Sequence, residues 1–321
     1  MTDATAPGKL ILSGEYAVLH DAPAIVMAVN RRAHVSVVPH DDSHSVLETP
    51  GLAEGAWHFD VDDDGTLCWL DETQVPGTTL LEAVALQTDF RLMSPVRVNV
   101  DTRGFFERTG GQKLGLGSSA AATVALTAAL SESRTDEEIW QKARRAHGEM
   151  QGGSGVDIAA SCFGGLLCYR QSAEAVPVSL NWPAALVCRV YFSGVSASTP
   201  AAIDRARSAG ASRDALVAAA DEAAAAWESG ECAAILESVQ AFTDRLRDFD
   251  EATSAGIFSA GHAEMCKGGD QLGVVYKPSG AGGGDCGVAL STDTGKLDAF
   301  DQVASSCGFV SLDIERDNSG L

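Results

Sequence analysis

The stretch that decides the fold reads Gly115-Leu116-Gly117-Ser118-Ser119-Ala120-Ala121-Ala122. It opens residues 119–130, which are almost entirely Ala, Val, Thr and Leu and predict a helix buried on all sides. Glycines at a helix start let the backbone approach an anion closely, and the unpaired N–H groups of the first turn point at that anion. The helix dipole adds partial positive charge, and a serine hydroxyl can coordinate Mg²⁺ beside phosphate oxygens. The stretch therefore predicts a phosphate-binding helix N-terminus.

The same stretch also satisfies the pattern G-x-G-x-x-A of dinucleotide-binding folds. In those folds the pattern follows directly on a buried strand, and an acid ends the next strand about twenty residues further on. Here the polar residues 107–113 precede it, and Glu137 and Glu138 open a helix instead. This context excludes a dinucleotide fold, and the missing G-x-x-x-x-G-K-[ST] pattern excludes a P-loop. A helix start without a ligand remains the alternative for this stretch taken alone.

Two further segments are rich in glycine. Residues 152–161 read Gly-Gly-Ser-Gly-Val-Asp-Ile-Ala-Ala-Ser. A lone Asp in such a run is often a helix N-cap, so a purely structural Asp157 is the alternative to a functional one. Residues 277–287 read Lys-Pro-Ser-Gly-Ala-Gly-Gly-Gly-Asp-Cys-Gly and place five glycines between two strands. Five glycines are more than a turn needs, because each one costs backbone entropy on folding. The loop therefore favours a bound ligand over a flexible hairpin.

The rest of the chain predicts an α+β fold in two layers, and 321 residues suggest two domains. The expected boundary lies near 170–180, giving domains 1–175 and 176–321. A capping box at Thr135 starts a helix that runs towards Met150. Two alanine-rich helices over 211–248 break near Gly230. The predicted strands are 9–12 and 24–29 as a hairpin, then 32–38, 95–100, 166–169, 272–276 and 288–290.

Composition limits the classes of partner. Asp and Glu total 44 against 23 Lys and Arg, so the formal charge is −21 and neither nucleic acid nor an anionic membrane surface is an expected partner. Mean hydropathy is +0.02, no apolar run reaches 18 residues, and no secretory signal is expected. The eight cysteines form no C-x-x-C pair, which predicts no zinc site and a reducing, cytoplasmic compartment. An anionic substrate would require the few cations to gather at its site.

Three segments together resemble the three motifs of the GHMP kinases. They are Lys9-Leu10 with residues 13–18 (Ser-Gly-Glu-Tyr-Ala-Val), residues 115–120, and residues 280–287. They occur in the order of that family and span essentially the whole chain. Within the family they are most similar to phosphomevalonate kinases, whereas mevalonate kinases usually have Asn-Pro where this chain has Gly152-Gly153. The resemblance implies the two-domain GHMP kinase fold, with an N-terminal domain like domain 2 of ribosomal protein S5 and a C-terminal α/β sandwich.

The resemblance also implies the activity. It indicates ATP-dependent phosphorylation of phosphomevalonate to diphosphomevalonate in the mevalonate pathway of isoprenoid biosynthesis, with Mg²⁺ as cofactor and ATP as co-substrate. A mevalonate kinase, or another GHMP kinase acting on a small molecule, is the alternative. A nucleotide-binding protein with this fold and no turnover is a third hypothesis, and the presence of Lys9, Asp157 and all three motifs argues against it.

Site residues follow from the resemblance residue by residue. Lys9 and Asp157 are the expected catalytic pair. The ATP phosphates are expected on Lys113, Gly115, Leu116, Gly117, Ser118, Ser119 and Ala120, with Ser119 also a metal ligand. The acceptor is expected to contact Lys9, Arg31, Ser154, Gly155, Asp157, Ser279, Gly280, Ala281 and Gly282. Mevalonate kinases carry a metal-ligating Glu eleven residues before the Asp, and this chain has Ala146 there.

The chemistry depends on the acceptor. A phosphomonoester has a second pKa of about 6, so its nucleophilic oxygen is largely anionic at neutral pH and needs no strong base. Asp157 would then orient Lys9, whereas with an alcohol acceptor it would act as general base. Further cation candidates are Lys113, Arg31, Arg32 and Lys277, although Arg32 and Lys277 are each expected to be solvated surface charges. His20, His34 and His147 are expected to be structural or surface residues.

Overall fold

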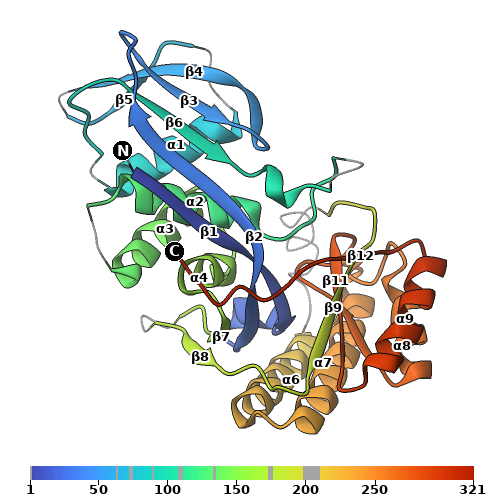
Figure 1. The fold of residues 1–321 in the computed structure, drawn as a ribbon. Helices are drawn as coiled ribbons and strands as arrows, with labels where there is room; N and C mark the ends of the chain where they lie inside the picture. Colours follow the sequence, from blue (N-terminus) through green and yellow to red (C-terminus); the bar gives the residue numbers. More distant parts are fainter. Residues whose placement is uncertain are drawn as a thin grey trace.

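Two β-sheets with helices packed on them organise the computed structural model, which describes residues 2–62, 64–71, 75–88, 90–107, 111–132, 135–172, 176–197 and 210–321 (Figure 1). The first sheet has eight strands in the order β5-β4-β3-β6-β2-β7-β8, with β1 paired to β2. Its strands are β1 (Thr2–Ser13), β2 (Ala24–Pro39), β3 (Ser45–Thr49), β4 (Ala53–Val61), β5 (Leu67–Trp69), β6 (Val96–Asp101), β7 (Leu166–Tyr169) and β8 (Val178–Leu180).

The second sheet has four strands in the order β10-β11-β9-β12, all antiparallel. They are β9 (Val187–Phe192), β10 (Val275–Pro278), β11 (Cys286–Ser291) and β12 (Val310–Leu312). The helices are η1 (Ala17–His20), α1 (Pro76–Thr88), η2 (Arg103–Phe105), α2 (Ser118–Leu130), α3 (Asp136–Met150), α4 (Val156–Phe163), α6 (Gly210–Ser229), α7 (Cys232–Thr253), α8 (His262–Leu272) and α9 (Thr294–Ser306). This composition confirms the α+β prediction.

The β1–β2 hairpin runs through the first sheet and joins it to the helices. The sequence predicts separate strands at 24–29 and 32–38, and this is wrong, because both belong to the single strand β2. Pro7 pairs with Arg32 while Gly8 pairs with Val29, so the residues between Val29 and Arg32 bulge out of register. A β-bulge bends a strand without ending it. The polar residues of the bulge imitate a strand end in the sequence.

Helix α2 is the buried helix that the sequence predicts, and it packs against β1 and β2. Apolar residues surround the whole helix, which matches its position between the sheet and the helices α1, α3 and α4. Helix α3 begins as predicted at Thr135, whose hydroxyl accepts a hydrogen bond from the Glu138 N–H at 3.4 Å. These two boundaries were predictable because each depends on residues within one helical turn.

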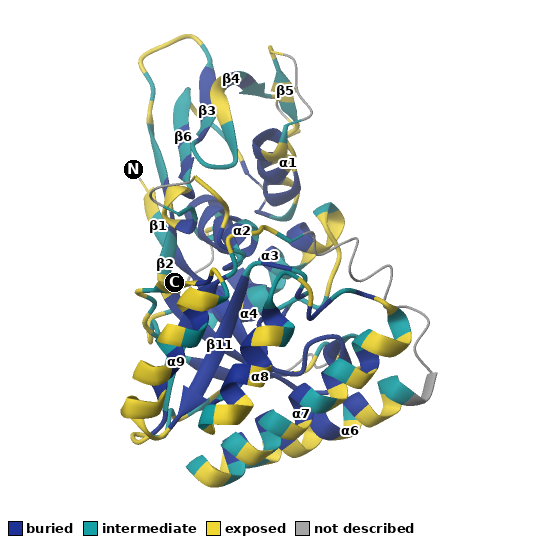
Figure 2. Ribbon diagram, turned by 90° about the vertical axis from the view of Figure 1, so that its right-hand side faces the viewer, coloured by how far each residue is buried: buried dark blue, intermediate teal, exposed yellow. Residues whose placement is uncertain are grey.

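The C-terminal helices confirm one prediction and correct another. Helices α6 and α7 are separated at Gly230, which has φ +73°, as the sequence predicts. The strand predicted over 272–276 begins too early in the sequence. Leu272 is the last residue of helix α8, and Gly273 terminates that helix with φ +66°. Strand β10 begins only at Val275. Figure 2 shows β11 dark blue, and therefore buried, beneath α8 and α9, whereas α6 and α7 carry exposed outer faces.

The end of the chain returns to the first sheet. The Asp317 N–H donates to the Ala28 carbonyl at 2.9 Å, so this segment lies along β2. Arg32 is therefore not the solvated surface charge that the sequence suggests. Its guanidinium lies 2.5 Å from the Asp317 carboxylate and donates to Thr5 Oγ1 at 3.0 Å and to the Gly320 carbonyl at 2.5 Å. The N–H groups of Arg32 are therefore used to hold the end of the chain in place.

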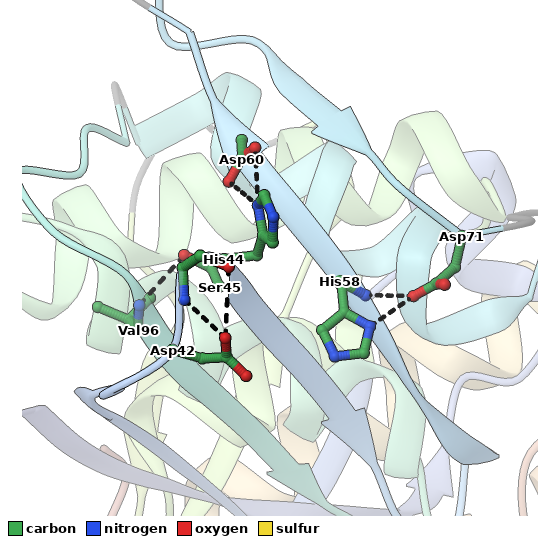
Figure 3. Close-up of polar contacts among 8 residues, drawn as sticks. Asp42, His44, Ser45, His58, Asp60, Asp71 and Val96 are labelled. Carbon is green, nitrogen blue, oxygen red and sulfur yellow. Dashed lines mark hydrogen bonds and ion pairs between the residues drawn. The ribbon is translucent and has the colours of Figure 1, made fainter.

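Two imidazole–carboxylate pairs lie on the outer strands β3 to β5 (Figure 3). His44 Nδ1 is 3.1 Å from Asp60, and His58 Nδ1 is 2.8 Å from Asp71. All four side chains are between 42% and 48% exposed, so each pair contributes little to stability. No cluster of three or more possible metal ligands (His, Cys, Asp or Glu) occurs within the described ranges. The pairs are surface contacts.

The described helices do not combine the length and apolar character that crossing a bilayer requires. The eight cysteines are free thiols, of which Cys162, Cys266 and Cys286 are buried. Burial raises the pKa of the Cys266 thiol to about 11. Such thiols remain protonated at neutral pH and pack as small apolar side chains.

Candidate active site

One pocket collects residues from two of the three glycine-rich segments, 152–161 and 277–287. The third segment, 115–122, contacts two of the lining residues, Lys9 and Gln151. The pocket offers about 880 Å³ of empty space, its open mouth included, between β1, η1, the end of α3, the start of α4 and the loop between β10 and β11. The residues that line it are Lys9, Ile11, Glu15, Tyr16, Val18, Leu19, His147, Gln151, Gly152, Gly153, Ser154, Val156, Asp157, Gly280 and Ala281. The pocket therefore brings the predicted catalytic pair, Lys9 and Asp157, together from positions far apart in sequence.

Lys9 extends from β1 across the loop that precedes α2. Its side chain is almost buried, its backbone N–H donates to the Leu116 carbonyl at 2.8 Å, and its Nζ lies 3.4 Å from the Gly115 carbonyl. A Cβ on Gly117 would lie 3.0 Å from Lys9 Cγ, so a glycine at 117 leaves room for the lysine stem. The ammonium group is thereby fixed between the loop and the pocket.

The loop before α2 has the features of an anion site. Gly117 is the N-cap residue at φ +81°, and no side chain caps the helix. Ser118 Oγ is buried with no hydrogen-bond partner among the described residues, and Ser119 Oγ accepts from Gln151 Nε2 at 2.8 Å. First-turn N–H groups, a serine hydroxyl and the helix dipole therefore converge where the sequence predicts phosphate.

Asp157 occupies the first turn of α4, which also begins at a glycine. Gly155 is the N-cap residue at φ +80°, so Asp157 is not the helix cap. Its half-buried carboxylate accepts from the Ile158 N–H at 3.0 Å. Tyr169 donates to the Ser154 carbonyl at 2.5 Å and so fixes the loop that leads into α4. Burial raises the pKa of Tyr169 to about 12, so its hydroxyl stays protonated as the donor. Asp157 faces the pocket from a fixed helix start.

The loop between β10 and β11 divides into residues that line the pocket and residues that anchor the loop. Gly280 and Ala281 line it, and Tyr16 donates to the Ala281 carbonyl at 2.6 Å. The Ser279 hydroxyl instead accepts from the Ile11 N–H at 2.8 Å and donates to the Ile11 carbonyl at 3.0 Å. Gly282 packs against Ile257, where a Cβ would lie only 2.5 Å from two of its atoms.

Lys277 is not a solvated charge, contrary to the expectation from sequence. Its side chain is fully buried, it forms an ion pair with Glu15, and it donates to the Pro278 carbonyl at 2.6 Å. Desolvation lowers the pKa of Lys277, and the charge of Glu15 opposes this change. Glu15 Oε2 has no hydrogen-bond partner among the described residues, although Glu15 lines the pocket. The pair joins the first and third motifs beneath the pocket.

Asp285 brings a carboxylate to the loop before α2. It has φ +53°, and a Cβ added to Gly115 would collide with its side chain. Asp285 Oδ1 accepts from the Ala197 N–H at 3.0 Å. Desolvation raises the pKa of Asp285, opposed by that hydrogen bond and by the charges of Lys9 and Lys113. The exposed Lys113 therefore lies at the edge of this loop, near Lys9 and Asp285.

Arg31 occupies a different place from the other predicted acceptor contacts. It lies in the β2 bulge, and its guanidinium donates to the Asp313 carbonyl at 3.2 Å. It lines a second pocket with Asn30, Arg32, His34, Asp101, Arg103 and Gly104. The structure therefore does not bring Arg31 into the pocket that holds Lys9 and Asp157.

Sequence reasoning missed two polar residues of the pocket. His147, in the last turn of α3, is 5% exposed, and its Nε2 is buried without a partner among the described residues. Gln151 follows one turn later and reaches Ser119. Their spacing of four residues places them on one helix face. That spacing was available in the sequence, but only the packing of α3 shows that this face borders a pocket.

Comparison with known proteins shows which proteins the chain resembles. Residues 82–165 match the model of the GHMP kinases N terminal domain. The chain is 32% identical to a phosphomevalonate kinase of Streptomyces sp. (strain CL190), over 89% of this chain and 88% of the relative. It is 26% identical to the mevalonate kinase of Homo sapiens, over 96% of this chain and 91% of the relative.

Solved structures share the fold. Streptococcus pneumoniae phosphomevalonate kinase in complex with phosphomevalonate and AMPPNP has a TM-score of 0.80 at 20% identity, covering 98% of this chain and all of that one. A Lin0012 protein from Listeria innocua has a TM-score of 0.83 at 22% identity, covering 98% and 97% of the two chains. Because the Streptomyces relative is 32% identical across most of both chains, this chain belongs to the GHMP kinase family.

Proposed function

We propose that this protein is a phosphotransferase that moves the γ-phosphoryl group of ATP to phosphomevalonate, giving diphosphomevalonate for isoprenoid biosynthesis. The observation that carries the proposal is the pocket that Lys9 and Asp157 share, with Asp157 in the first turn of α4 and Lys9 hydrogen-bonded to the loop before α2. The 32% identical phosphomevalonate kinase supports this choice of acceptor. The eight free thiols favour a reducing compartment, and we place the reaction in the cytoplasm.

ATP binding follows from the loop before α2. The phosphates would accept hydrogen bonds from the first-turn N–H groups and from the unpartnered Ser118 hydroxyl, and the helix dipole would favour their charge. Lys9 Nζ, close to the Gly115 carbonyl, lies where the γ-phosphoryl group would meet the acceptor. Phosphoryl transfer depends mainly on such positioning and charge stabilisation.

The residues present fit a magnesium ion that is held largely by ATP. Mg²⁺ keeps several waters and takes one or two protein oxygens together with phosphate oxygens. Ser119 would supply a hydroxyl, and the preceding residue Ser118 has a buried Oγ with no partner among the described residues. Ala146 is fully buried and offers no oxygen where mevalonate kinases carry a Glu. When bound, the ion would neutralise charge on the ATP phosphates.

The acceptor end of the pocket would need no strong base. The phosphate of phosphomevalonate is largely anionic at neutral pH, so its oxygen is already nucleophilic. Lys9 would offset the repulsion between the two polyanions, and Asp157 would orient the acceptor and Lys9. Ser154, Gly280 and Ala281 also border this end of the pocket.

A coupled ADP-release assay with Mg²⁺-ATP tests the proposal, with phosphomevalonate and mevalonate compared side by side. Turnover with phosphomevalonate and none with mevalonate is expected. Lys9→Met should lower kcat by about 10²-fold or more, because it removes a charge that acts on the transferring group. Loss of a general base typically lowers kcat by about 10²- to 10⁴-fold. Asp157→Asn should lower kcat by less than this. Turnover with mevalonate alone would overturn the acceptor assignment and make Asp157 the base.

A further inference from the structure

The pocket contains few cations for the acceptor that we propose. Phosphomevalonate carries a phosphate and a carboxylate, so it brings about three negative charges to a protein of formal charge −21. Among the described residues that line the pocket, Lys9 is the single lysine or arginine. Arg32 and Lys277 are engaged in ion pairs, and Arg31 lines another pocket. Further donors for the acceptor are therefore to be sought among the other polar groups that line the pocket.

His147 has the properties of that donor. It lines the pocket, is 5% exposed, and leaves Nε2 buried without a partner among the described residues. An unsatisfied polar atom costs about 1–3 kcal/mol, so a buried one at the wall of a pocket indicates a missing partner in the ligand. With its proton on Nε2, the ring is a hydrogen-bond donor in the wall of the pocket.

The surroundings of His147 favour an anionic partner. His147 lies in the last turn of α3, where the carbonyl end of the helix dipole stabilises positive charge. The carboxylates of the pocket are each engaged at one oxygen, since Glu15 Oε1 is paired with Lys277 and Asp157 Oδ1 accepts from the Ile158 N–H. Gln151, one turn further on, binds Ser119 and places this face of α3 next to the loop before α2.

We propose that His147 is a specificity-determining residue that donates from Nε2 to an anionic oxygen of the acceptor. The inference rests on the proposed function and deepens it, because it names the group that recognises the acceptor besides Lys9. Phosphate and carboxylate oxygens share this chemistry, and comparison of phosphomevalonate with mevalonate distinguishes them. The proposal assigns His147 to the acceptor and not to the ATP phosphates.

Steady-state kinetics of His147→Leu and His147→Gln test the inference. A hydrogen bond to a charged group contributes enough that its loss should raise KM for phosphomevalonate roughly 10- to 100-fold in His147→Leu. KM for ATP should stay within about twofold, and Tm should not fall, because the imidazole Nε2 has no partner among the described residues to lose. His147→Gln keeps a donor and should recover part of the effect. His58→Leu, on the outer strand β4, is the matched control and should leave all constants unchanged.

Each outcome has one meaning. If the wild-type enzyme turns over phosphomevalonate and His147→Leu leaves its KM unchanged, or raises KM for ATP equally, the inference is wrong while the proposed function stands. If the wild type does not turn over phosphomevalonate, both fall together. Where mevalonate is also a substrate, an equal effect on its KM assigns the contact to the carboxylate. An effect confined to phosphomevalonate assigns the contact to the phosphate.

Discussion

Breaking the buried Lys277–Glu15 pair should destabilise the protein strongly. Lys277→Met keeps the apolar stem of the side chain and removes the ammonium group. Glu15, whose side chain is 1% exposed, would then be a buried carboxylate without its cation. The Pro278 and Ile11 carbonyls, 2.6 and 3.4 Å from Nζ, would also lose their donor.

The structure sets the expected magnitude. Removing one partner of a fully buried ion pair typically costs about 3–5 kcal/mol, because the remaining charge is left uncompensated. Both side chains here are at most 1% exposed, so solvent cannot replace the lost partner. The double variant Lys277→Met/Glu15→Gln removes the stranded charge and should be more stable than the sum of the single changes by about 2 kcal/mol. Arg245→Met, which breaks an exposed pair with Asp248, should cost at most about 1 kcal/mol.

Urea unfolding followed by tryptophan fluorescence gives the free energies for this cycle, with circular dichroism as a second probe. A loss below about 1 kcal/mol in Lys277→Met, equal to that in Arg245→Met, would refute the reasoning, since it would mean that the pair is solvated. Additive single and double variants would refute the coupling between the two residues.

Two further predictions concern pH and the loop before α2. Burial lowers the pKa of His262 to about 4, so the folded protein holds this ring neutral while the unfolded chain binds a proton near pH 6.5. Stability is therefore full above pH 6.5 and should fall by about 3 kcal/mol between pH 6.5 and 4. His262→Phe, which frees its partner Tyr276, should lower the overall stability but flatten that slope in urea unfolding, and an unchanged slope would contradict the assignment. Gly115→Ala should raise KM for ATP at least about tenfold, because left-handed φ costs about 1–2 kcal/mol and the new Cβ would collide with Asp285. Gly111→Ala is the matched control, having φ +65° but open space, and an equal effect of both changes would exclude the collision as the cause.

Local features of the fold were predictable because their causes lie within a few residues. The apolar composition of 119–130 predicts a buried helix, and the cap at Thr135 predicts the start of α3. Gly230 separates α6 from α7 as expected. The bulge in β2 was not predictable, because its polar residues imitate a strand end and only pairing with β1 shows that the strand continues.

The candidate site divides in the same way. The glycine-rich segments and the resemblance of their motifs point to Lys9, Asp157 and the loop before α2, and the pocket brings Lys9 and Asp157 together. The glycine-rich sequence around Lys277 does not indicate whether this lysine is buried or exposed, because its partner Glu15 lies 262 residues away. His147 shows no local motif, so its place at the pocket wall depends on how α3 packs.

The sequence by itself determined the α+β content of the fold and the positions of the helix N-termini that follow glycines. It also determined the three motifs that mark the family. These depend on backbone freedom, side-chain periodicity and capping, which act over one or two turns of chain. Tertiary structure alone decided which charges are solvated. Lys277 is buried against Glu15, and Arg32 binds Asp317 across 285 positions. His147 lines the pocket with a nitrogen that has no partner among the described residues. Burial and pairing depend on segments far apart in the chain, and folding alone brings these segments together.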